Sequence, residues 1–314
     1  MPGLPLRVGT RGSPLALVQT RAFLEQIMAV CPVLRAMDAF REFAIATTGD
    51  AVQNRLLADI GGKGLFAREI HEALLDGRID FAVHSLKDLE TELPAGIVLA
   101  CTLKREDARD ALILPEGAAD PDDPFASLAP GALVGSASLR RQAQLLAARP
   151  DLRVGLIRGN VQTRLGKVRG GEFGGSLLAL AGLRRLGLEA EAAAILPTSL
   201  MLPAACQGIV GVTVRERDHE LHALLSAVED PEAAAVSRAE RALLAALDGN
   251  CRTPIGGHAT LLPDGRLRLE GLTARADGSF LLRRVVEGAA SDAVALGAAL
   301  GAELRADSPA DIFG

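Results

Sequence analysis

The segment DFAVHSLKD at residues 80–88 places an acid directly after a run of apolar residues. Asp88 is expected at the end of a strand, where the adjacent Lys87 favours its ionised form. A carboxylate held there can stabilise a cationic intermediate. Acids in turns and surface ion pairs produce the same pattern, so the segment alone leaves both interpretations open. His84 has no metal-ligand partner at a suitable spacing and is interpreted as structural.

Two further segments predict a strand, a small polar turn and a helix start. In GTRGSPLAL at 9–17, Ser13 is expected to cap a helix with proline at its first position, and Arg11 precedes it. VGSASLRRQ at 134–142 repeats the pattern with Ser136, Ser138, Arg140 and Arg141. Helix starts bind anions and arginine forks bind carboxylates, so the repetition favours a ligand with several carboxylates.

Three more arginines follow apolar runs later in the chain: Arg158, Arg164 and Arg185. In a chain this rich in arginine, any single one is more often part of a solvated helix face. Their recurrence after strands favours binding, because ligands of open α/β sheets lie at the carboxyl ends of strands.

A glycine loop, GGKGLF at 61–66, carries Lys63. It lacks the phosphate-loop pattern GxxxxGK[ST], so it is interpreted as a substrate-covering loop or as a flexible connection. Cys251, in LDGNCRTPIGG at 247–257, is the best of the four cysteines for covalent chemistry because glycine, asparagine and proline surround it.

Composition narrows the classes of function. The net charge of −5 argues against a nucleic-acid surface, and only four of the 34 basic residues are lysine. The cysteines share no metal-ligand spacing, so no metal is expected. No apolar run approaches the roughly 20 residues of a membrane-spanning helix, and the amino terminus lacks the apolar core of a secretion signal. We therefore expect a cytoplasmic protein without a membrane partner.

Up to about residue 200, short apolar runs alternate with helical patterns, which predicts an α/β fold. The apolar run GIVGVTVR at 208–215 is expected to return to the sheet of the first domain. After two helical stretches, turns at 263–265 and 277–278 predict antiparallel hairpins, and a final alanine-rich helix follows. The last third therefore predicts a small α+β domain.

Ten segments occur in the order found in hydroxymethylbilane synthases (porphobilinogen deaminases), and the chain resembles that family over about residues 7 to 257. The segments are GTRGSPLAL, TTGD, GGKGLF, HSLKD, RED, VGSASLRRQ, RGNVQTRL, LALAGLRRLGL, LPAACQG and LDGNCRTPIGG. The resemblance implies two periplasmic-binding-protein-like domains with mixed sheets and a small C-terminal domain. The implied boundaries are 1–104 with 203–221, then 105–202, then 222–314.

The resemblance also implies an activity: four porphobilinogen molecules are condensed on a covalent dipyrromethane cofactor, with release of ammonia and final hydrolysis to hydroxymethylbilane. It further implies a monomer that acts on this small molecule alone. The rival interpretation is a non-enzymatic carboxylate-binding module of the periplasmic-binding-protein type. That rival assigns no role to Cys251 or to the third domain.

Site residues carried over by the resemblance fall into four groups. Asp88 matches the catalytic acid, and Lys63 lies in the covering loop. Cofactor-binding positions are Cys251, Lys87, Ser85, Ser138, Arg140, Arg141, Arg158 and Arg164. Substrate-binding positions are Arg11, Ser13, Arg158, Arg164 and Arg185. The chain departs from the family pattern at Asp59, Leu89-Glu90, Gly174-Gly175 and Cys206.

Overall fold

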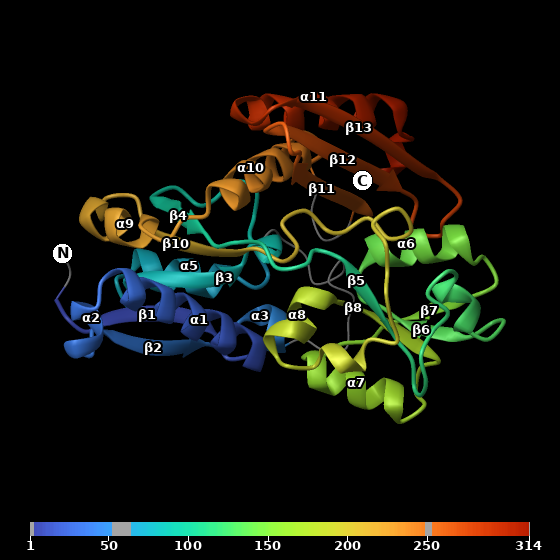
Figure 1. The fold of residues 1–314 in the computed structure, drawn as a ribbon, viewed down its shortest axis with the longest axis horizontal. Helices are drawn as coiled ribbons and strands as arrows, with labels where there is room; N and C mark the ends of the chain where they lie inside the picture. The colour runs from blue at the N-terminus through green and yellow to red at the C-terminus, as the bar shows by residue number, and fades with distance from the viewer. Residues whose placement is uncertain (1–2, 52–63, 249–252, 314) are drawn as a thin grey trace. The chain divides into compact units, whose positions relative to one another are not determined.

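The computed structural model describes residues 3–51, 64–248 and 253–313, and these residues divide into two compact units (Figure 1). Unit 1 holds the described residues of 1–52, 62–106 and 209–234. Unit 2 holds those of 53–61, 107–208 and 235–314. Helix α10, Pro231–Ala246, runs from the first unit into the second.

Unit 1 is built on one mixed sheet with the strand order β2-β1-β3-β10-β4. Its strands are β1 (Leu6–Arg11), β2 (Phe40–Ile45), β3 (Phe81–Ser85), β4 (Ile97–Thr102) and β10 (Val210–Arg215). Its helices are α1 (Pro14–Val30), α2 (Val33–Ala36), α3 (Thr48–Ala51), α5 (Arg68–Leu75) and α9 (His219–Ser226), with the 3-10 turn η1 (Leu86–Asp88). The expected return of 208–215 is confirmed, since β10 lies antiparallel between β3 and β4.

Apolar side chains pack within unit 1 from both covering layers. Phe23 and Ile27 of α1 are fully buried, and the Phe23 ring lies edge-on to Phe81, with centroids 5.8 Å apart. Ile70 and Leu74 of α5 belong to a second buried cluster. Burial of each such side chain contributes roughly 2 kcal/mol. Cover on both faces explains why a strand such as β4 is apolar nearly throughout.

Unit 2 contains a second mixed sheet with the order β7-β6-β8-β5-β9. Its strands are β5 (Asp110–Ile113), β6 (Leu133–Gly135), β7 (Arg153–Gly155), β8 (Gly175–Ala179) and β9 (Ala194–Ile195). Its helical elements are η2 (Pro124–Ser127), α6 (Leu139–Ala148), α7 (Val161–Arg169), α8 (Leu180–Arg185) and η3 (Glu189–Glu191). Strand β5 is antiparallel to both of its neighbours, as β10 is in unit 1, so the two sheets share one topology.

The predicted hairpins form a small third sheet in unit 2. Strands β11 (Ile255–Leu261), β12 (Arg266–Ala274) and β13 (Leu281–Ala289) pair antiparallel in sequence order. Figure 1 shows α11, Ala293–Asp307, lying along β12 and β13. The short turns η4 (Ala290–Asp292) and η5 (Ala310–Ile312) flank that helix. The predicted α/β class with two mixed sheets and a small C-terminal α+β part is confirmed.

The boundaries of the three predicted domains stay a prediction, because contacts within the described residues define two units.

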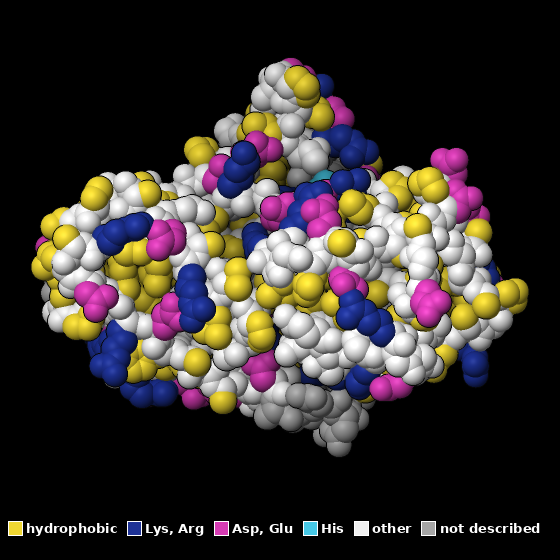
Figure 2. Space-filling view, turned by 60° about the horizontal axis from the view of Figure 1, so that its bottom comes forward, with side chains coloured by type: hydrophobic (Ala, Val, Ile, Leu, Met, Phe, Trp, Pro, Cys, Tyr) yellow, Lys and Arg dark blue, Asp and Glu magenta, His cyan; other side chains and the backbone are white. Residues whose placement is uncertain are grey.

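On the face shown in Figure 2, acidic and basic side chains are interspersed. Surface pairs such as Arg21 with Glu42, 3.1 Å apart, follow the same pattern. Among the helices that the structure describes, none combines the length and the hydropathy needed to cross a membrane.

Candidate active site

The structure brings the predicted Arg11 and Asp88 together at one edge of the unit 1 sheet. Arg11 ends β1 and Asp88 ends η1, the turn that directly follows β3. Since β1 and β3 are parallel neighbours, their carboxyl ends meet at the same edge. The Arg11 Nη1 atom lies 3.4 Å from Oδ2 of Asp88, whose side chain is 30% exposed. A partly exposed carboxylate with a cation beside it can act on a bound ligand.

Two residues that the sequence did not single out hold Arg11 in place. Asp50 accepts hydrogen bonds from Nε and Nη2 of Arg11, at 3.1 and 2.5 Å, and from the Thr47 hydroxyl at 2.8 Å. The Arg11 guanidinium also lies 4.1 Å from the centre of the Phe66 ring. Burial lowers the pKa of Arg11, but the hydrogen bonds to Asp50 and the nearby carboxylates outweigh it and raise that pKa. The only signal for these partners was their place in the TTGD and GGKGLF segments.

The other predicted unit 1 residues lie on the same two segments. The Ser13 hydroxyl caps α1 by accepting from the Ala16 amide at 3.4 Å, as predicted. Ser85 donates from its hydroxyl to the side-chain oxygen of Gln19, 3.0 Å away. Lys87 is exposed on η1, next to Asp88 in the chain. The first turn of α1 and the turn after β3 therefore both contribute polar groups near Arg11.

In unit 2 the predicted strand, turn and helix start is also present. Ser138 caps α6, accepting from the Arg141 amide at 3.4 Å. Arg140 and Arg141 are buried, at 4% and 7% exposure, and each donates to Asp110 over 2.8 Å. Each also donates to a backbone carbonyl oxygen, that of Leu202 or Leu177. These contacts make the pair part of the unit 2 core, and a role in binding the cofactor stays a prediction.

The remaining predicted arginines are also in unit 2. Arg158 is 6% exposed and follows β7, which ends earlier than predicted, at Gly155. Arg164 donates from Nε to the carbonyl oxygen of Gly159 at 2.9 Å, on α7. Arg185, the last residue of α8, donates to the carbonyl oxygen of Gly208 at 2.6 Å. Their roles toward a ligand stay predictions.

Asp110 is the centre of this buried charge group. It is fully buried, and it also accepts from the side-chain amide of Gln207 at 2.7 Å. Burial alone raises the pKa of a carboxyl group, but the charges of Arg140 and Arg141 reverse that effect and hold the pKa of Asp110 well below its usual range. The carboxylate is therefore ionised at neutral pH and fixes the first turn of α6 to β5.

Replacing Asp110 with asparagine is expected to lower the free energy of unfolding by about 3–5 kcal/mol, because two arginines stay buried with one partner charge removed. Asp151→Asn is the control, since Asp151 pairs with Arg149 at the surface and is 42% exposed; a much smaller loss is expected there. Urea denaturation of both variants measures the difference. Equal losses would contradict a structural role for the buried group.

Cys251 and Lys63 lie outside the described residues, as does Asp59. Of the other cysteines, Cys101 and Cys206 are buried and Cys31 is partly exposed. Burial, with the charge of Glu229, raises the pKa of the Cys101 thiol to about 12, so this thiol stays protonated at neutral pH. Cys206 adopts a left-handed backbone conformation, with φ of 62°, which favours glycine.

His84 is structural, as predicted. It is 7% exposed, and its Nε2 atom lies 2.9 Å from the Thr213 hydroxyl. Burial, with the charges of His71 and Arg11, lowers the pKa of His84 to about 3. Between about pH 6.5 and pH 3 the unfolded chain therefore binds a proton that the folded protein does not.

The free energy of unfolding is thus expected to fall as pH decreases through this range, with His84 contributing about 1.4 kcal/mol per pH unit. His84→Gln removes this contribution and should flatten the dependence. Urea denaturation at several pH values from 7 to 4 measures it, with His219→Gln on the exposed start of α9 as the control. Identical slopes in wild type and His84→Gln would contradict the buried neutral histidine.

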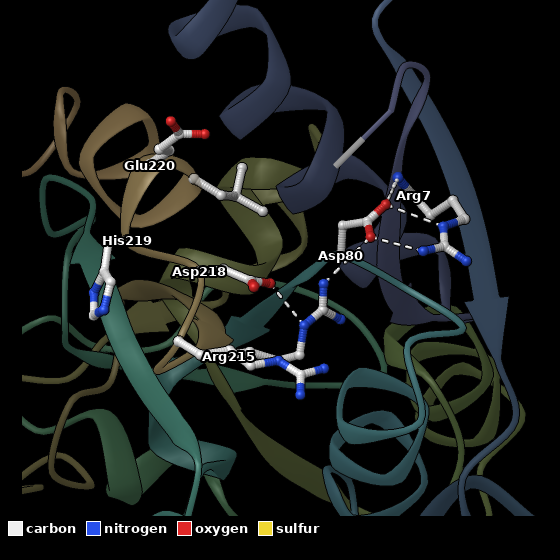
Figure 3. A pocket seen from close by; sticks show the side chains of 8 residues that line it. Arg7, Asp80, Arg215, Asp218, His219 and Glu220 are labelled. Atoms are coloured by element: carbon white, nitrogen blue, oxygen red, sulfur yellow. Dashed lines mark hydrogen bonds and ion pairs between the residues drawn. The ribbon is translucent and has the colours of Figure 1, made fainter. Parts of the chain in front are cut away.

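A cavity of about 510 Å³ in unit 1 lies at the other edge of the sheet (Figure 3). Its lining includes Arg7 from the start of β1, Asp80 from just before β3 and Arg215 from the end of β10. Asp80 accepts from Arg7 at 3.0 and 2.7 Å and from Arg215 at 3.4 Å. Burial favours a higher pKa for Asp80, but these hydrogen bonds outweigh it and lower that pKa. Arg7, Asp80 and Arg215 pair with one another, so we interpret these charges in the cavity lining as a structural ion-pair network.

The fold and this geometry define a class: a mixed α/β protein with an acid and an arginine at the carboxyl edge of its sheet, where small charged molecules bind. Among the described residues, no group of three His, Cys, Asp or Glu side chains could hold a metal ion. Two family models match: the dipyrromethane cofactor binding domain of porphobilinogen deaminase over residues 6–223, and the porphobilinogen deaminase C-terminal domain over 234–306. The chain belongs to the porphobilinogen deaminase family.

Curated relatives support this membership over nearly the whole chain. Porphobilinogen deaminase of Paracoccus denitrificans is 49% identical over 99% of this chain and 97% of that protein. That of Nitrobacter winogradskyi is 49% identical over 95% and 92%, and that of Sorangium cellulosum 47% over 96% and 98%. The chain is accordingly a transferase of porphyrin biosynthesis, from a family whose substrate is porphobilinogen. The rival interpretation, a non-enzymatic binding module, is therefore wrong.

Solved structures with a similar fold are more distant. They include a periplasmic binding protein with high arginine specificity from Salmonella typhimurium, 14% identical over 74% of this chain and 97% of that chain, with a TM-score of 0.40. Another is the periplasmic molybdate-binding protein of Azotobacter vinelandii, 11% identical over 74% and 96%, with a TM-score of 0.38. The fold class follows from the strand orders of the two mixed sheets.

Proposed function

We propose that the chain is a hydroxymethylbilane synthase, which condenses four porphobilinogen molecules head to tail on a covalent dipyrromethane primer. It releases ammonia at each step and hydrolyses off the linear tetrapyrrole. The observation that carries the proposal is the partly exposed Asp88 carboxylate beside Arg11, at the carboxyl edge of the unit 1 sheet. Membership of the family supplies the substrate class.

The proposed chemistry needs an ionised carboxylate. When the C–N bond of the protonated aminomethyl group breaks, ammonia leaves and porphobilinogen becomes an electron-poor azafulvenium cation. A C–C bond then forms between its methylene carbon and the free α-carbon of the growing chain, and that α-carbon loses its proton. Positive charge lies near a pyrrole nitrogen in both stages. Asp88 is proposed to stabilise that charge, because a fixed carboxylate costs no reorganisation when the charge develops.

Arg11 and Ser13 are proposed to bind substrate carboxylates, together with Arg158, Arg164 and Arg185. Because Asp50 holds Nε and Nη2 of Arg11, the Nη1 side of the fork is the part that faces Asp88. This places the cation where it can orient a substrate carboxylate next to the catalytic acid. Lys63 is proposed to cover the substrate from the glycine loop.

The family model supports a dipyrromethane cofactor, whose acetate and propionate groups need hydrogen-bond donors. Lys87 is exposed beside Asp88, and the buried Nε atoms of Arg140 and Arg141 have no hydrogen-bond acceptor among the described residues. Both are donors that suit carboxylates. When bound, the cofactor supplies the first nucleophilic pyrrole carbon. We propose a thioether to Cys251 and polar contacts from Ser85, Lys87, Ser138, Arg140, Arg141, Arg158 and Arg164.

We further propose that the enzyme works as a cytoplasmic monomer with three domains and with no nucleic-acid or membrane partner. The family resemblance supports each of these points. Size-exclusion chromatography with light scattering checks the first: a mass near the 32.7 kDa of one chain is expected, and a mass near twice that value would contradict it.

Intact-protein mass spectrometry with peptide mapping tests the proposed function most directly. The purified chain is expected to carry a two-pyrrole adduct on the peptide that contains Cys251, and to gain one, two and three further pyrrole units when mixed with a limiting amount of porphobilinogen. A chain that stays unmodified in both experiments and consumes no porphobilinogen would overturn the proposal.

A further inference from the structure

The carboxylate of Glu90, two residues beyond Asp88, is buried within unit 1. Its side chain is 10% exposed, and its Oε2 atom lies 3.9 Å from Nδ1 of His71 on α5. On its other side is the backbone of Gly64, where a methyl group would fall 1.8 Å from Oε1 of Glu90. Gly64 has a φ of 80°, a conformation that favours glycine, and a methyl group there would force the Glu90 carboxylate to shift. Glu90 thus fills a site shaped by two other segments.

Contacts and short chain segments connect Asp88 to Glu90 through Arg11, Phe66 and Gly64. Asp88 lies 3.4 Å from Arg11, and Arg11 lies over the ring of Phe66 at 4.1 Å. Phe66 is two residues from Gly64, which packs against Glu90, and Glu90 is two residues from Asp88. The turn that carries the acid is therefore held by Arg11 on one side and by Glu90 on the other.

His71 contributes a buried and otherwise unsatisfied partner. It is 3% exposed, and neither ring nitrogen makes a hydrogen bond to any of the residues that the structure describes. Its ring lies 5.9 Å from that of His84 on β3, and β10 adds the uncharged Thr213 hydroxyl behind His84. The charge of Glu90 acts on His71, and the charges of His71 and Arg11 act on His84. Burial lowers the pKa of His71, and the charge of Glu90 opposes that change.

We propose that Glu90 is a positioning residue for the condensation, and that its carboxylate, seated between His71 and Gly64, fixes the turn that presents Asp88. The proposal rests on the proposed function, which makes Asp88 the catalytic acid. A buried carboxylate at this place costs desolvation energy, which the contact with His71 only partly offsets. Its benefit is geometric, because a carboxylate stabilises a developing cation only from a fixed place.

The first test compares Glu90→Ala with wild type in steady-state kinetics with porphobilinogen. We expect kcat to fall about 10-fold, because the turn loses the side chain seated between His71 and Gly64, while KM changes less than about 2-fold. Glu72→Gln is the control. Glu72 is exposed on α5, the helix that carries His71, and its replacement removes one negative charge, as the replacement of Glu90 does. Cofactor occupancy by mass spectrometry normalises each rate to the loaded enzyme.

Glu90→Gln keeps the volume and removes the charge, so it tests the contact without emptying the site. NMR titration of the His71 ring is expected to show a lower pKa of His71 in Glu90→Gln than in wild type, with no change in Glu72→Gln. Unfolding would instead raise the pKa of His71 toward the ordinary value of about 6.5, so the direction of the change separates the two effects. Glu90→Gln should also retain kcat within about 3-fold, because the amide can occupy the same site.

Two results would overturn the inference. One is a folded Glu90→Ala whose kcat equals that of wild type at equal cofactor occupancy. The other, which decides the matter if Glu90→Ala does not fold, is an unchanged His71 titration in Glu90→Gln. Wild-type protein that consumes no porphobilinogen would instead remove the proposed function, and this role with it.

Discussion

Asp88→Asn is expected to slow porphobilinogen consumption by about 10²–10³-fold, because it removes the charge that stabilises the azafulvenium cation while keeping the size of the side chain. Arg11 should stay in place in this variant, since Asp50 and Phe66 hold it independently. The protein should therefore remain folded with its cofactor attached. Single-turnover kinetics, with mass spectrometry to count pyrrole units, measures the effect.

The control for this variant is Asp76→Asn, which removes an exposed acid paired with Arg78 at the end of α5. It should leave the rate unchanged. If Asp88→Asn turned over porphobilinogen as fast as wild type, Asp88 would be a structural acid whose role is to pair with Arg11, and the proposed chemistry would need another carboxylate.

Cys251→Ser is expected to abolish product formation altogether, because the hydroxyl is a far weaker nucleophile than a thiolate and cannot form the thioether. Intact mass should equal that of the unmodified chain, before and after incubation with porphobilinogen. Circular dichroism and a thermal melt should show a folded protein, since one sulfur is exchanged for one oxygen.

Cys31→Ser is the matched control for this change, as Cys31 is a partly exposed free cysteine at the end of α1. It should keep both the adduct and the activity. Full turnover by Cys251→Ser would place the cofactor on another residue, and an adduct lost in both variants would indicate a general effect on cofactor assembly.

Local sequence patterns predicted the secondary structure well where capping and periodicity act within a few residues. The run at 14–30 is a helix with Ser13 as its cap, and Ser138 caps the helix that follows β6. The hairpin turns and the final helix are also where they were predicted. The strand expected through Arg158 is shorter, because apolar character alone does not supply a pairing partner after Gly155.

The family resemblance also implied that Arg11 and Asp88 belong to one site, and the structure brings the two side chains together. It did not identify Asp50 and Phe66 as the partners of Arg11. Those contacts join positions 39 and 55 residues away along the chain, and nothing in their immediate neighbours records that proximity.

By itself, then, the sequence determined the α/β class, the order of the motifs and the family, since these depend on residue type and local spacing; the roles of Asp88 and Cys251 stay predictions. Only the tertiary structure decided which charges are exposed and which are buried. Arg140 and Arg141 resemble other arginines after a strand, yet the antiparallel strand β5 brings Asp110 against them. Glu90 was a departure from a motif until the fold placed it between His71 and Gly64. The physical reason is that burial and pairing of charge depend on distances between strands and helices remote in sequence.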